Sequence, residues 1–145
     1  FKKGDILDME GNIVGKHEGI INFTIGQRKG IGIAHKEPLY VANINAKKNE
    51  VVVGNREALL IKKIHLKNLN LLSDVNEYND HLFIKVRSTG RFIKARVNLS
   101  NDGAEVNLEE METGISPGQA CVFYTQNKIG DKVLGGGWIV KTENK

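Results

Sequence analysis

Short stretches of alternating apolar and polar residues are the feature that most constrains the fold of this chain. In residues 81–87, His-Leu-Phe-Ile-Lys-Val-Arg, every second side chain is aliphatic. Glycine, asparagine or aspartate interrupts such stretches about every eight to twelve residues. A period of two is typical of strands with one buried face, and this spacing of breaks is typical of small sheets and barrels. The sequence therefore predicts an all-β protein.

The pattern predicts strands in two groups. The first group is 5–8, 12–14, 19–24, 39–45 and 50–54, and the second is 61–66, 81–87, 91–97, 104–108, 120–124 and 132–141. Only 56–60 and 69–74 are predicted as short helical turns. A strand ends near Asn55, and a charged stretch precedes the next apolar run. We therefore expect two small β modules, residues 1–60 and 61–145.

Composition limits the class of protein. Apolar residues make up 40% of the chain, which is enough for a real core, and no apolar run is long enough to cross a bilayer. The single cysteine, Cys121, rules out an internal disulfide and fits a reducing, cytoplasmic setting. It lies in an apolar segment, so a buried thiol with a raised pKa is expected. Because the chain begins at Phe1, we expect a soluble piece of a longer protein.

Charge is unevenly distributed although the net charge is only +4. Residues 81–97 contain no acid and five bases, which are Lys85, Arg87, Arg91, Lys94 and Arg96. Residues 102–112 contain five acids and no base. One face can therefore be strongly positive while the molecule as a whole is nearly balanced.

A hairpin closed at Ser88-Thr89-Gly90 would merge the outer faces of two strands into one surface. Phe83 and Phe92 would lie there beside four cations, namely Lys85, Arg87, Lys94 and Arg96. Cations neutralise phosphates and rings stack on bases, a combination suited to single-stranded or looped RNA. An ordinary solvated strand face, kept soluble by its charges, explains the same residues. Both interpretations remain open from the residues alone.

Two loops could also approach a partner. The loop 24–32 carries three glycines, Arg28 and Lys29, but it matches no nucleotide-binding fingerprint. The Pro-Gly pair of Ser116-Pro117-Gly118-Gln119 suits a tight turn that fixes where Gln119 points. The loop 24–32 could equally be a structural turn, and a glutamine at such a Pro-Gly turn more often bonds only to nearby backbone. The Gly135–Gly137 run before Trp138 is interpreted as architecture, allowing a bulge or close strand packing.

Catalytic groups are scarce. The four histidines are scattered, and there is no second cysteine for a zinc site. Glu109, Glu110 and Glu112 form an acidic run that we expect to be a solvated loop, since nothing sets two carboxylates in different environments. We predict no catalytic residue and no metal site.

The order of several motifs resembles that of the tRNA-specific 2-thiouridylase (MnmA) family. The matching blocks are residues 15–19 (Gly-Lys-His-Glu-Gly), 23–32, 38–41 (Pro-Leu-Tyr-Val), 116–120 (Ser-Pro-Gly-Gln-Ala) and 134–137 (Leu-Gly-Gly-Gly). The resemblance covers nearly the whole chain. It implies a small central β module followed by a six-stranded barrel similar to domain 2 of translation elongation factors, both helping to clamp the tRNA anticodon arm.

In that family an amino-terminal domain uses ATP to adenylate C2 of the wobble uridine, and a cysteine pair delivers persulfide sulfur. This chain contains neither the phosphate loop nor the cysteine pair. The resemblance therefore implies a tRNA-binding part without a cofactor of its own. Its expected partners are tRNA, its own catalytic domain and a sulfur-relay protein, with no membrane.

The resemblance also assigns tRNA contacts to Arg87, Ser88 and Gln119. A tyrosine often follows the arginine in relatives, so Ser88 departs from the pattern and a ring contact is not expected there. Arg28 and Lys29 are candidate RNA contacts through their place in the 23–32 block. A different hypothesis, prompted by the acidic stretch 102–112, is a protein-interaction barrel that docks on the catalytic domain, a sulfur donor or a translation component. Catalysis by the chain itself is a third alternative.

Overall fold

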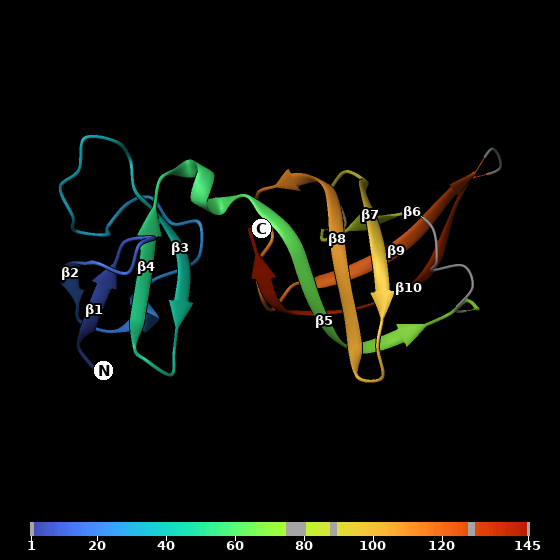
Figure 1. The fold of residues 1–145 in the computed structure, drawn as a ribbon, viewed down its shortest axis with the longest axis horizontal. Coiled ribbons are helices and arrows are strands. Elements are labelled where there is room, and N and C mark those ends of the chain that lie inside the picture. The colour runs from blue at the N-terminus through green and yellow to red at the C-terminus, as the bar shows by residue number, and fades with distance from the viewer. Residues whose placement is uncertain (1, 75–80, 88–89, 128–129, 145) are drawn as a thin grey trace. The chain divides into compact units, whose positions relative to one another are not determined.

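The structure is a computed structural model, and it describes residues 2–74, 81–87, 90–127 and 130–144. Regular structure in this part is almost entirely β-strand, which confirms the all-β prediction. The chain divides into two units, Phe1–Leu60 and Ile61–Lys145 (Figure 1).

The first unit contains a four-stranded sheet in the order β2-β1-β4-β3. Its strands are β1 (Gly4–Leu7), β2 (Ile13–His17), β3 (Tyr40–Asn45) and β4 (Glu50–Gly54). Strands β1 and β4 run parallel, and the other two pairs are antiparallel. Alternate strand residues pack inward with one loop residue to form its core, which is Ile6, Ile31, Val41, Val51 and Val53.

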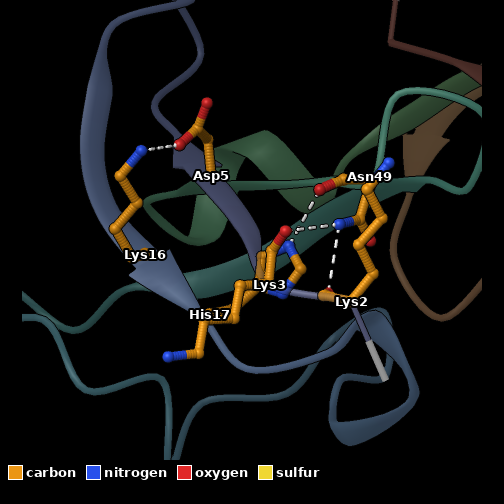
Figure 2. Close-up of polar contacts among 6 residues, drawn as sticks. All are labelled: Lys2, Lys3, Asp5, Lys16, His17 and Asn49. Atoms are coloured by element: carbon orange, nitrogen blue, oxygen red, sulfur yellow. Dashed lines mark hydrogen bonds and ion pairs between the residues drawn. The ribbon is translucent and has the colours of Figure 1, made fainter.

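A hydrogen-bonded cluster joins β2 to the turn between β3 and β4. The buried His17 donates from Nε2 to the Asn49 carbonyl (2.9 Å), and the Asn49 amide donates to the carbonyls of Lys2 (3.1 Å) and Lys3 (2.9 Å), as Figure 2 shows. A side chain on Gly4 would place its Cβ 2.1 Å from the Asn49 carbonyl oxygen, so only glycine fits there. His17 of the 15–19 block thus has a structural role in this unit.

The strand predicted at 19–24 is wrong. A short 3-10 helix, η1 (Ile20–Asn22), occupies this segment, closed by a bond from the Phe23 amide to the Ile20 carbonyl (3.1 Å). One such turn brings residues three apart to one side, and Ile20 and Phe23 both pack against the core while Ile21 is exposed. The predicted turn after Asn55 is confirmed as η2 (Arg56–Leu59), which the Asn55 side chain caps.

The second unit is a closed six-stranded barrel in the order β10-β5-β8-β7-β6-β9, with all pairs antiparallel (Figure 1). Its strands are β5 (Ile61–Leu71), β6 (His81–Lys85), β7 (Ile93–Leu99), β8 (Gly103–Glu112), β9 (Ala120–Asn127) and β10 (Gly130–Glu143). The predicted alternation is confirmed, because Leu82, Ile84, Ile93, Ala95 and Val97 all point into the core.

Two predictions about this unit are wrong. The helical turn expected at 69–74 is absent, because β5 continues to Leu71 and pairs there with Gly135 and Gly136 of β10. The acidic run at Glu109–Glu112 is the end of strand β8 and not a loop. In both places a distant partner strand supplies the backbone hydrogen bonds that the local sequence does not reveal.

Candidate nucleic-acid interface

The predicted pairing of the two basic strands is present. Strands β6 and β7 are antiparallel, with Phe83 opposite Lys94 and His81 opposite Arg96. Because their alternate residues are buried, Phe83, Lys85, Lys94 and Arg96 belong to the outer face of the barrel. The turn predicted between the strands includes Ser88 and Thr89, which lie outside the described residues.

Three rings and one cation cluster on this outer face. Phe92 packs edge-to-face against Tyr124 (5.1 Å between ring centroids) and against Phe83 (6.3 Å). The Lys85 ammonium lies 4.3 Å from the centroid of Phe92 and 5.9 Å from that of Tyr124. These contacts hold Lys85 by cation–π attraction and fix the orientation of the rings. Sequence reasoning missed Tyr124, because only the pairing of β6 with β9 brings it beside Phe83.

Acids of β8 lie beside bases on β7 and just before it, and this limits the positive charge of the face. Glu109 is 3.6 Å from the Lys94 ammonium, and Glu112 forms an ion pair with Arg91. The two strands are hydrogen-bonded neighbours, so the acidic stretch is adjacent to the basic one. Positive charge is therefore partly neutralised on this flank of the barrel.

Arg87 and Gln119 converge on a single backbone carbonyl. The Arg87 guanidinium donates from Nη2 to the Gly114 carbonyl (3.0 Å), and the Gln119 amide donates from Nε2 to the same oxygen (3.2 Å). The Gln119 Oε1 accepts from the Ser116 amide (3.1 Å), and this bond holds the turn that the Pro-Gly pair predicts. Within the described part of the chain, Arg87 has no carboxylate partner.

Gly114 makes this convergence possible. Its φ is +79°, a backbone conformation that favours glycine, and an added Cβ would lie 2.4 Å from the Arg87 Nη2. Sequence reasoning missed Gly114, since a glycine after an acidic run gives no sign of which side chains will meet its carbonyl. We name this group of Arg87, Gly114 and Gln119 the carbonyl hub.

The other candidate contacts lie in the first unit. Arg28 and Lys29 are exposed in a loop that Gln27 organises. The Gln27 Oε1 accepts from the Thr24 amide (2.9 Å), and its Nε2 donates to the Lys29 carbonyl (2.8 Å). The glutamine of the 23–32 block is thus used internally, while both cations face solvent.

Reactive groups other than these are few. Cys121 is fully buried in the barrel core as predicted, and burial raises the pKa of its thiol from 9.0 to about 12. A thiol in that state is almost entirely protonated near neutral pH and is a poor nucleophile. In the described ranges, no group of three or more His, Cys, Asp or Glu side chains could hold a metal ion. The same ranges contain no helix long and apolar enough to span a membrane.

Comparison with known proteins agrees with this architecture. Residues 1–55 match a family model described as tRNA methyl transferase PRC-barrel domain, and residues 61–139 match one described as Aminomethyltransferase beta-barrel domain. Relatives named tRNA-specific 2-thiouridylase MnmA include proteins from Rhodopseudomonas palustris (48% identical, covering 96% of this chain) and Zymomonas mobilis (46%, also 96%).

A third relative with that name, from Ehrlichia canis, is 48% identical over 95% of this chain. The chain spans 36%, 35% and 37% of the lengths of these three proteins, so it corresponds to roughly one third of each. The order of the sequence blocks, the barrel and these similarities agree with one another. The chain therefore belongs to the tRNA-specific 2-thiouridylase family.

Proposed function

We propose that this chain is the tRNA-binding part of a tRNA-specific 2-thiouridylase and that it positions the anticodon arm. The parent enzyme thiolates C2 of the wobble uridine with ATP and persulfide sulfur, and it acts in the cytoplasm. The chain itself contributes no catalytic residue and no cofactor. Its partners are tRNA, the catalytic domain of the same enzyme and a sulfur-relay protein. The observation that carries the proposal is the carbonyl hub.

The hub supports RNA binding because it orients charge without cancelling it. A guanidinium has five N–H donors, and Arg87 spends one on a neutral carbonyl and none on a carboxylate among the described residues. Its full charge and its remaining donors are therefore available to a phosphate or ribose. Gln119 uses one amide N–H on the same carbonyl, and its second N–H can meet a sugar or a base edge.

Both side chains are held in place before RNA arrives. Each is anchored to a backbone group of the barrel, so binding costs less side-chain entropy than it would for flexible lysines. Phe83 lies on β6, Phe92 just before β7 and Tyr124 on β9. Together these rings add apolar area to the outer face of the barrel. Arg28 and Lys29 are proposed as further contacts from the first unit.

Salt dependence of tRNA binding tests the proposal. Arg87→Ala should weaken filter binding of a tRNA anticodon stem-loop across sequences and lower the slope of log affinity against log salt by roughly one unit. Arg87→Lys keeps the charge but loses the bidentate geometry of the guanidinium. Compared with Arg87→Ala, it should therefore recover the salt slope more fully than the affinity. Lys47→Ala, in the exposed β3–β4 turn, removes the same charge as a control. An Arg87→Ala slope equal to that of the unaltered chain would contradict the proposal.

A second candidate function is protein docking, favoured by the carboxylates of β8. Glu109 and Glu110 are exposed there, and Glu110 forms no ion pair within the described part of the chain. A protein partner with a basic surface would be attracted to this strand. Salt-sensitive capture of the catalytic domain or a sulfur donor by the chain, with no tRNA retained, would favour docking over RNA binding.

A further inference from the structure

A shallow hollow on the barrel wall lies where β5, β9 and β10 meet. Its volume is about 260 Å³, which is below the usual 300–1,000 Å³ of pockets for whole small molecules. Its lining is mostly apolar and includes Ala120, Val122, Gly136 and Trp138, with Asn68 and Asn70 at its β5 side. The hollow has room for part of a ligand that is bound mainly elsewhere.

Trp138 has the largest side chain of the residues that line the hollow. It is the only tryptophan of the chain, and 52% of its surface is exposed. The glycines before it allow the neighbouring strands to approach closely. At Gly136 an added Cβ would lie 2.5 Å from the Cys121 carbonyl oxygen, and at Gly137 one would lie 2.6 Å from the Leu69 side chain. The backbone itself therefore lines this part of the hollow.

A β-bulge places amide side chains next to the indole. Trp138 is opposite Lys67 and Gly136 is opposite Asn70, so Gly137 alone faces Asn68 and Leu69 on β5. Bulges redirect side chains, and the positive φ of Asn68 (55°) is one that asparagine tolerates. Neither amide, Asn68 or Asn70, has a hydrogen-bond partner among the described residues.

Backbone contacts connect one edge of the hollow to Gln119 of the carbonyl hub. Trp138 is paired with Ala120, the residue next to Gln119. The following residue, Ile139, donates its amide to the Gln119 carbonyl (2.9 Å) and accepts from the Gly118 amide (2.8 Å). The backbone of Gln119 is therefore bonded to the residue that follows Trp138, and an RNA strand longer than one nucleotide can reach from Gln119 to the indole.

We propose that an unpaired nucleobase of the RNA held at the carbonyl hub stacks on Trp138 in this hollow. The amides of Asn68 and Asn70 bond to the base edge, and the exposed Lys67 ammonium, opposite Trp138, meets a neighbouring phosphate. The proposal rests on the proposed RNA-binding function. An apolar peptide would also fit an exposed indole, but it would leave two amides and a cation without complementary groups.

The single tryptophan makes the proposal directly measurable. The chain is titrated with an anticodon stem-loop while indole fluorescence is recorded, and binding is measured in parallel by filter retention. Base stacking should quench the indole with the same midpoint as binding and should shield it from acrylamide. A blunt RNA duplex of equal length offers phosphates but no unpaired base, so it should bind without quenching.

Substitutions separate the base contact from the hub. Trp138→Ala should weaken stem-loop binding roughly 5- to 150-fold, the range expected for the loss of one stacked base. Trp138→Phe retains a ring and should lose less. Asn68→Gly removes an amide without straining the positive φ, and Val140→Ala, an exposed change on the same strand outside the hollow, is the matched control. Thermal unfolding verifies that each variant folds.

The outcomes distinguish this proposal from the function on which it rests. If the stem-loop is retained but indole fluorescence and acrylamide access do not change, the base site is overturned and RNA binding stays intact. The same conclusion follows if the duplex quenches the indole as strongly as the stem-loop does. A chain that retains no RNA overturns both. Unaltered RNA affinity in Trp138→Ala, together with weaker capture of the catalytic domain, assigns the hollow to protein docking and overturns the base site.

Discussion

The barrel presents cations in two different ways. At the carbonyl hub, Arg87 is bonded to the neutral carbonyl of Gly114, whereas on the β7–β8 flank Lys94 lies 3.6 Å from the Glu109 carboxylate. The first arrangement orients the guanidinium and leaves its charge intact. In the second, the carboxylate partly neutralises the ammonium. The five bases of residues 81–97 are therefore not equivalent, and a count of cations in a sequence window overstates the charge that a phosphate can meet.

Gly114→Ala should produce the largest change in RNA affinity, because it strains the residue whose carbonyl is the acceptor and displaces the Arg87 guanidinium that donates to it. The new Cβ would lie 2.4 Å from the Arg87 Nη2 and would occupy a positive φ. We expect a loss of stem-loop affinity of roughly tenfold or more, typical of a lost hydrogen bond to a charged group. Filter binding measures the loss of affinity, and urea unfolding separately measures the loss of stability caused by backbone strain.

Gly11→Ala is the matched control for that variant. Gly11 has a similar φ of +90°, but nothing lies within 4 Å of its added Cβ. It should lose stability from backbone strain and retain RNA affinity. Equal affinity losses in the two variants would mean that strain alone, and not the position of Arg87, explains the result.

Gln119→Leu should have the next largest effect. It removes the amide that bonds to Gly114 and Ser116 while keeping a side chain of similar size. A loss of roughly fivefold in stem-loop affinity is expected for one neutral hydrogen bond. Because no charge is removed, the salt slope should stay unchanged, in contrast to Arg87→Ala. A fall in the salt slope would contradict the assignment of charge to Arg87 and of orientation to Gln119.

Glu109→Gln, on the β7–β8 flank, should raise RNA affinity, whereas the hub variants lower it. Without the carboxylate, Lys94 can release a counterion on RNA binding, so affinity should rise slightly and the salt slope should increase by at most about one unit. Salt-dependent filter binding detects it. If Lys94→Ala instead weakens binding as much as Arg87→Ala, the flank cation is as available as the hub cation and the comparison fails.

Glu143→Gln should have the smallest effect, on stability in acid. The hydrogen bond from His65 (2.5 Å), on the neighbouring strand β5, lowers the pKa of the Glu143 carboxyl below its ordinary 4.5. The ionised group therefore stabilises the fold above that value, and this contribution is lost as the pH falls through the lowered pKa. The variant should show a shallower decline of unfolding temperature on acidification. Melting curves recorded at several pH values measure it, and identical declines would exclude this contribution.

The alternation of the sequence predicted most of the fold. It gave the all-β class and the inward direction of Leu82, Ile84 and Ile93, since these depend on local periodicity. It failed where distant pairing decides, as at the extension of β5 to Leu71 and at the extension of β8 beyond Leu108 to Glu112. For the candidate site, the sequence singles out Arg87 and Gln119, which the structure brings to one carbonyl, but their shared acceptor Gly114 could not be predicted, because a carbonyl leaves no mark in the sequence.

The most direct test of the hub is a magnetic resonance titration of the isotope-labelled chain with an anticodon stem-loop. We expect the largest chemical-shift changes at the Gln119 side-chain amide, the Arg87 guanidinium and the Gly114 backbone amide. Changes around Lys94 and Glu109 should be smaller. Changes concentrated on the β7–β8 flank, with the hub signals unmoved at saturation, would contradict this expectation.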